Sequence, residues 1–194
     1  LETQPPRRSP AALARGLIRR CERAALATAL TTPSGVWPYG SLVLAACDQD
    51  GSPLLLLSAL AEHTKNLSRD PKASLLFDGT GGRDDPLTGE RATVLGTLAP
   101  IADEYSRERF LRRHPAARTY AGFADFRLFR MSVARAHLVV YQPSQVALVV
   151  RIAADGRASL GLLEQRAQRR GFAQLPGLDD DAAIARRRLQ HDFD

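Results

Sequence analysis

A short strand followed by a turn of polar side chains has the clearest chemical potential in this sequence. Residues 54–70 read LLLLSALAEHTKNLSRD, so an apolar run ends at Ser58 and a helical turn and a half then follows. That turn presents His63, Thr64, Lys65 and Asn66. A phosphate group needs backbone donors at a helix start, hydroxyl donors and a fixed cation, and this segment could supply all three. The spacing alone leaves a second interpretation open, a polar surface helix with Ser58 as its cap.

Short β-prone runs separated by turn residues surround this segment. We expect strands at 26–32, 40–48, 53–58, 72–78 and 91–101, with one or two more in 126–140. The Asp50-Gly51 pair predicts a tight hairpin, because glycine there tolerates a positive φ. An open sheet of this length would leave exposed edges, so the pattern predicts a mainly β (α+β) fold, a closed or split β-barrel of about six antiparallel strands.

Helices are expected at the periphery of this barrel. Residues 10–25 read as an amphipathic helix with Ser9 as its cap, and helices are also expected over 59–69 and 103–113. The glycine-rich stretch 79–89 is expected to be a mobile loop that could serve as a lid. The predicted organisation is a flexible segment 1–9, a barrel domain 10–152 ending in a strand at 146–152, and a helical appendage 153–194 with helices at 160–170 and 182–189.

Composition excludes several classes of function. The net charge of +6 comes mainly from the first thirty residues, which hold six arginines and two glutamates, and a solvated helix face explains them better than nucleic-acid binding does. Cys21 and Cys47 lack zinc or disulfide spacing, and neither an HExxH motif nor a GxSxG elbow occurs. No apolar run approaches the length of a membrane span, and the first ten residues do not resemble a signal peptide. We therefore expect a cytoplasmic protein without a metal site, nucleic-acid partner or membrane partner.

Four stretches of the chain resemble one family. Residues 27–78, ATVLG at 92–96, FLRRHP at 110–115 and YAGFADF at 120–126 are similar to pyridoxamine 5'-phosphate oxidase-like FMN-binding split barrels, particularly the branch with bacterial haem-utilisation (HugZ-like) proteins. The resemblance implies a homodimer that shares two FMN molecules at its interface. It places Ser41 beside the flavin or ribityl chain and the side chains of 58 and 63–66 around the phosphate, with Arg91 as a further candidate. The oxidase carries an Arg-Lys pair where Glu62 and His63 stand here, which argues against pyridoxamine phosphate oxidation.

Three functions follow from this resemblance. The first is an FMN-dependent oxidoreductase acting on an unidentified small molecule, because FMN itself supplies the redox chemistry. The second is a haem-binding or haem-degrading protein on the same barrel, and the third is a non-enzymatic flavin-binding dimer. Trp37 and Tyr39 could cover the flavin ring or anchor a hairpin. No catalytic residue can be named, while His114 is expected at an exposed helix end and His137 in a packed or interfacial strand.

Overall fold

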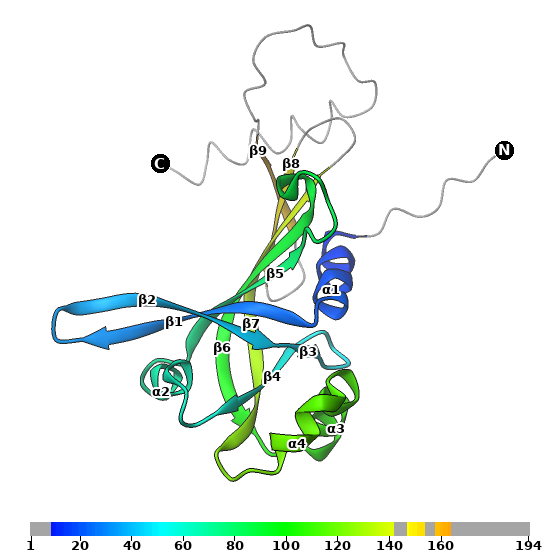
Figure 1. Cartoon of the computed structure of the whole chain (residues 1–194). Helices are drawn as coiled ribbons and strands as arrows, with labels where there is room; N and C mark the ends of the chain where they lie inside the picture. Colours follow the sequence, from blue (N-terminus) through cyan, green and yellow to red (C-terminus); the bar gives the residue numbers. More distant parts are fainter. Residues whose placement is uncertain (1–8, 142–146, 154–157, 164–194) are drawn as a thin grey trace, which may run out of the picture.

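A single antiparallel sheet dominates the computed structural model, which describes residues 9–141, 147–153 and 158–163 (Figure 1). Its strands are β1 (Arg23–Thr32), β2 (Gly35–Leu44), β3 (Ala46–Cys47), β4 (Pro53–Ser58), β5 (Lys72–Gly79), β6 (Glu90–Ile101), β7 (Phe126–Tyr141), β8 (Ala147–Ala153) and β9 (Ala158–Leu163). The helices are α1 (Pro10–Arg20), α2 (Glu62–Arg69), α3 (Glu104–Arg113) and α4 (Arg118–Ala121), with 3₁₀ turns η1 (Pro86–Thr88) and η2 (Pro115–Ala117).

The sheet closes into a barrel through the β2–β3 segment. The strand order is β2-β1-β5-β6-β7-β4-β3, and only Ala45 separates the first strand in this order from the last. The amide of Ala45 donates to the carbonyl of Glu22 at 2.9 Å, which holds the junction against the start of β1. One continuous chain therefore pairs with β1 and then with β4, and the predicted split-barrel fold is confirmed.

The barrel has an interior core and a second core outside it. Leu26, Phe77, Val94 and Met131 are fully buried inside, where the apolar face of α1 also packs. The second core joins α3 and α4 to the outer side of β4 and β7 and contains Leu54, Leu56, Phe110, Leu111 and Leu128. Because β4 is covered on both sides, its four consecutive leucines are all buried, which explains why this strand shows no alternation in sequence.

Helix α1 is shorter than the sequence predicted. Ser9 caps it as expected, accepting from the amide of Ala12 at 3.3 Å, but the helix ends at Arg20 rather than at residue 25. Residues 23–25 instead begin β1 and pair with 44–42 of β2. The sequence Arg23-Ala24-Ala25 suited either structure, and strand pairing prevailed.

The β1–β2 hairpin is longer than predicted and extends beyond the barrel (Figure 1). Its two strands pair over ten residues each, so β2 begins at Gly35 rather than at residue 40 and includes Trp37 and Tyr39. On its other side β1 pairs with β5 only at residues 25–27. The distal half of the hairpin therefore has a barrel strand on neither edge. The turn expected at Asp50-Gly51 is confirmed, with Gly51 at φ 97°.

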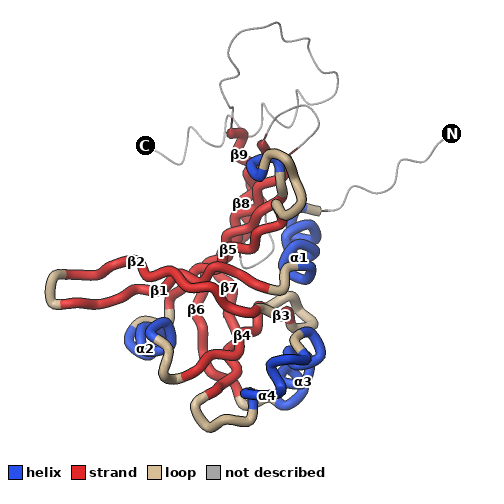
Figure 2. Tube along the Cα trace, viewed as in Figure 1, coloured by secondary structure: helices blue, strands red, loops and turns tan. Residues whose placement is uncertain are grey.

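The sheet extends past the barrel at the other end through β8 and β9 (Figure 2). The strand predicted at 146–152 is confirmed as β8. The helix predicted at 160–170 is wrong at its start, because residues 158–163 pair with β8 as β9. Its remainder and the helix predicted at 182–189 lie outside the described residues.

Candidate functional site

Helix α2 lies against the β1–β2 hairpin and connects β4 to β5 (Figure 1). Thr64, Asn66 and Leu67 form its buried side. Asn66 is completely buried and donates from Nδ2 to the hydroxyl of Thr28 on β1 at 3.1 Å. This contact fixes the rotation of α2, so that its remaining polar side chains face β2 and solvent.

Ser41 of β2 and His63 of α2 are directly linked. The hydroxyl of Ser41 lies 3.1 Å from Nδ1 of His63. Burial lowers the pKa of His63, which favours the neutral imidazole at physiological pH. Its Nε2 is buried and has no hydrogen-bond partner among the described residues. A neutral imidazole offers one donor and one acceptor, so the Ser41 contact decides which of them Nε2 presents.

The N-terminal end of α2 has no side-chain cap. Ala61 occupies the cap position without a side-chain hydrogen bond, and the amides of Thr64 and Lys65 both donate to its carbonyl. The hydroxyl of Thr64 is buried without a partner among the described residues. The ammonium of Lys65 lies 3.7 Å from Oε2 of Glu62, and both side chains are substantially exposed. This end could hold an anion, but it already carries a carboxylate.

Two predicted site residues have other contacts. Ser58 donates to Oδ2 of Asp125 at 2.6 Å and accepts from the amide of Leu60 at 3.1 Å, so it joins two loops. Arg91 lies opposite Asp78, whereas Lys72, which follows α2, lies opposite Thr97. Arg91 and Thr97 are six residues apart along β6, which corresponds to about 20 Å. The structure therefore brings residues 41 and 63–66 together at α2. Ser58 lies a few residues before that helix, and Arg91 lies away from it. Contact with FMN stays a prediction for all seven residues.

The outer face of the sheet carries a row of exposed leucines that sequence analysis missed. Leu42, Leu76 and Leu95 belong to β2, β5 and β6 and are 72%, 40% and 38% exposed. Leu42 pairs with Ala25, which in turn pairs with Leu76, so these side chains share one face. The signal was present as consecutive apolar residues, LVL at 42–44 and LLF at 75–77, where a strand with one solvated face should alternate.

Charged and polar side chains border this leucine face. Arg135 on β7 lies opposite Leu95, and the half-buried His137 lies opposite Thr93. At the barrel end Arg91 pairs with Asp78. Hydrogen bonds from Thr80 lower the pKa of Asp78, and the charges of Arg91 and Arg23 lower it further, so these three groups lie close together. An apolar surface with cationic borders suits a flat ligand that carries carboxylates.

The α2 side chains and the leucine face lie on opposite sides of the hairpin. Ser41 pairs with Leu26, whose side chain points into the barrel, and directly paired residues share a face. Trp37 and Tyr39 have the same parity as Ser41, so they lie on the α2 side, whereas Leu42 lies on the outer side. The molecule thus offers two distinct surfaces for a planar group.

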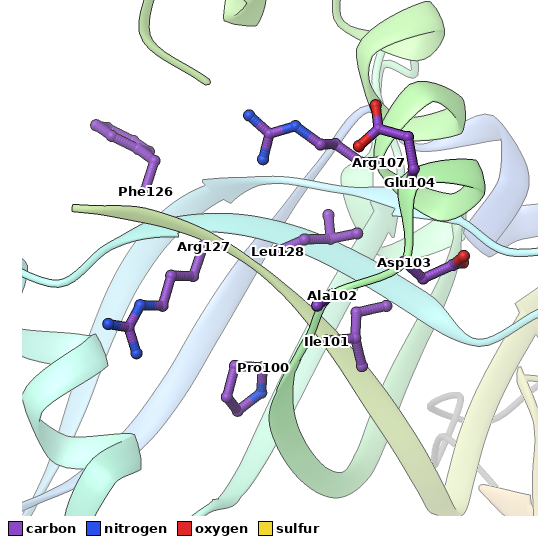
Figure 3. Close-up of a pocket in the computed structure, with 9 residues that line it drawn as sticks. All are labelled: Pro100, Ile101, Ala102, Asp103, Glu104, Arg107, Phe126, Arg127 and Leu128. Atoms are coloured by element: carbon purple, nitrogen blue, oxygen red, sulfur yellow. The ribbon is translucent and has the colours of Figure 1, made fainter. Parts of the chain in front are cut away.

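A pocket of about 500 Å³ opens at a third place, between the ends of β6 and β7 and the start of α3 (Figure 3). Arg107 and Arg127 line it, but they lie on opposite sides of the β7 ribbon. Asp103 is engaged as the cap of α3: hydrogen bonds from Ser106 lower the pKa of this carboxyl. The charged groups therefore do not converge on one point.

His114 is the residue after the last turn of α3, at the helix end as predicted, but it is buried rather than exposed. It is 8% exposed, its Nε2 lies 2.9 Å from the carbonyl of Ala45, and its ring packs on Phe110. The turn between α3 and η2 packs against the β2–β3 junction. His114 therefore has a structural role, because it joins the two segments.

Within the described ranges, no group of three or more histidine, cysteine or acidic side chains is placed to hold a metal ion. None of the helices described is both long and apolar enough to cross a membrane.

Comparison with known proteins places the chain in a family. Residues 5–141 match the family model described as CREG, beta-barrel. The chain is 40% identical over 99 residues to the protein named non-canonical heme oxygenase HOZ, chloroplastic, from Arabidopsis thaliana. That alignment covers 49% of this chain and 29% of the relative, so the chain matches less than a third of the length of that protein.

Solved structures agree with this assignment. A heme-binding protein from Mycobacterium smegmatis is 30% identical with a TM-score of 0.68, over 78% of this chain and 61% of that one. Campylobacter jejuni ChuZ is 15% identical with a TM-score of 0.59, over 78% and 66%, which shows a shared fold. The barrel closure and the family match together establish that this chain belongs to the CREG β-barrel family, within the pyridoxamine 5'-phosphate oxidase-like split barrels.

Proposed function

We propose that this protein binds haem on the outer leucine face of its sheet. The observation that carries the proposal is the exposed row Leu42, Leu76 and Leu95 on three strands of one sheet. Monomeric proteins rarely leave a continuous apolar surface open unless something binds there. Two relatives are named for haem, one as a haem oxygenase and one as a heme-binding protein, which supports haem as the occupant.

The chemistry of this face fits a porphyrin. The leucines, with the small Ala25 between Leu42 and Leu76, form an apolar floor. Exposed Arg135, with Arg23 at the barrel end, can pair with propionate groups, for which guanidinium geometry is well suited. His137 is the one histidine on this face among the described residues, which makes it our candidate axial ligand.

We further propose that the protein acts as a homodimer through the same face. A haem lying on one sheet would keep its second side in water unless another surface covered it. A second copy supplies a self-complementary apolar surface, because a twofold interface uses the same patch on both subunits. The exposed Leu44, also on β2, extends the patch available for this contact.

Haem titration of the purified protein tests the proposal. We expect a Soret band on haem addition, and Leu76→Glu should weaken haem binding at least tenfold because it places a charge on the apolar floor. Leu60→Glu is the matched control, since Leu60 is 75% exposed but lies in the loop before α2. Equal haem affinity in the wild type and Leu76→Glu would exclude this face. Slow loss of the Soret band with a reductant and oxygen would indicate haem degradation in addition to binding.

An FMN-dependent oxidoreductase of unidentified small-molecule substrate is the second candidate. It is favoured by the unpartnered Thr64 hydroxyl at the open end of α2, and by Trp37 and Tyr39 on the same side of the hairpin. The absorption spectrum of the protein as purified distinguishes flavin from haem. If FMN binds at α2, the double variant Thr64→Ala/Lys65→Ala should weaken FMN much more than riboflavin, since only FMN carries a phosphate.

A further inference from the structure

Glu62 stands at the place in α2 where an anionic ligand would be held. It is the first residue of the helix, where unpaired amides and the helix dipole favour negative charge. Its Oε2 lies 3.7 Å from the ammonium of Lys65. The carboxylate therefore pairs with Lys65 and belongs to the residue at the positive end of the helix dipole.

Among the described residues, Lys65 is the only cation that forms an ion pair with this carboxylate. The side chains of β1 and β2 that hydrogen-bond to side chains of α2 are Thr28 and Ser41, and both are neutral. His63 is biased to its neutral form by burial. Arg69, the other cation of α2, is in the last turn of the helix. Lys65 is thus the single cation of the first turns of α2, and Glu62 pairs with it.

Two polar atoms near this end of the helix are buried and unused. Thr64 is 7% exposed, and its hydroxyl has no partner among the described residues. Nε2 of His63 is in the same situation. Leaving buried polar atoms unpaired is costly, so a ligand group that reached either atom would remove that cost.

We propose that the Glu62 carboxylate competes with anionic ligands for Lys65 and for the N-terminal end of α2. This competition makes α2 select against dianionic phosphate ligands. A phosphate that approached Lys65 would have to displace the Glu62 carboxylate and would meet its negative charge. The inference concerns α2 and does not require haem to bind on the leucine face. It explains on physical grounds why a split barrel with this helix would bind FMN weakly.

Flavin fluorescence quenching tests the proposal with Glu62→Gln, which keeps the size of the side chain and removes its charge. We expect the Kd of FMN to fall on the order of fivefold and the Kd of riboflavin to stay unchanged, with the gain shrinking in 0.5 M salt because exposed charges are screened. Inorganic pyrophosphate should compete with FMN more strongly in the variant. Glu108→Gln on α3 is the control, because Glu108 also pairs with basic side chains on the surface.

A second variant keeps the proposal testable if Glu62→Gln alters the helix. Lys65→Met in the Glu62→Gln background should abolish the gain in FMN affinity, since the released cation is then absent. Equal gains for FMN and riboflavin, a gain that survives Lys65→Met, or no measurable FMN binding by Glu62→Gln would each overturn the proposal. Haem affinity is measured separately by the Soret band, so failure of the haem proposal and failure of this one remain distinguishable.

Discussion

The hydroxyl of Ser41 on β2 and Nδ1 of His63 on α2 lie 3.1 Å apart and link the β1–β2 hairpin to the helix that lies against it. The two residues are far apart in sequence, on either side of β3 and β4. The contact forms because Ser41, opposite Leu26 of β1, points to the side of β2 where α2 packs.

The stability of this arrangement should depend on pH through His63. Burial lowers the pKa of His63 below its ordinary 6.5, so the unfolded chain binds more protons near that pH. This contribution to the free energy of unfolding is present above pH 6.5 and is lost as the pH falls towards the folded pKa. Urea denaturation from pH 7.5 to 5.5 should show the decline, and His63→Gln should flatten it. A decline of the same size in His63→Gln would assign it to other groups.

Asp125 should contribute to the position of α2. Its carboxylate accepts the hydroxyl of Ser58 at 2.6 Å, and its carbonyl accepts the amide of Ala59 at 2.7 Å. Asp125→Ala removes only the first contact, so we expect a loss of about 1–2 kcal/mol in the free energy of unfolding. Denaturant titration measures it, with Asp125→Asn, which keeps an acceptor, as the milder comparison. A loss as large in Asp125→Asn would point to the charge rather than the hydrogen bond.

Gly96 should tolerate no side chain. The register of β6 and β7 shifts between Leu95 and Gly96, and a Cβ at this position would lie 2.2 Å from the carbonyl oxygen of Ser132. Gly96→Ala should therefore destabilise the barrel by about 3 kcal/mol or more, because backbone must move. Gly40→Ala on β2 is the control: no atom lies within 4 Å of its added Cβ, so we expect a change within about 0.5 kcal/mol. Similar melting temperatures for both variants would contradict the predicted close packing.

The leucine face should determine the oligomeric state if it forms the proposed dimer interface. Leu42 is the most exposed of the three leucines in its row, so a charge there would be buried on association. We expect Leu42→Lys to convert a dimer into a monomer in light scattering, with the circular dichroism spectrum unchanged. Leu87→Lys, at a 61% exposed leucine in the β5–β6 loop, should leave the mass unchanged. A wild-type monomer would exclude the interface.

The sequence by itself determined the barrel and the polar segment after Ser58. Short β-prone runs, the Asp50-Gly51 turn and the leucines of β4 express local preferences and burial, which act over a few residues and are legible along the chain. The approximate positions of six strands, of α2 and of α3 follow from these preferences. The missed end of α1 and the missed β9 lie where apolar or helix-forming residues suit both structures, so that long-range pairing decides.

Only the tertiary structure decided how those residues are used. Ser58 meets Asp125, Asn66 meets Thr28 and His114 meets Ala45, contacts between segments that the sequence does not connect. The separation of Arg91 from α2 and the single face shared by Leu42 and Leu76 follow from strand register. Register depends on the closure of the whole barrel, because most of the strands pair with two neighbours at once, and no local pattern contains that information.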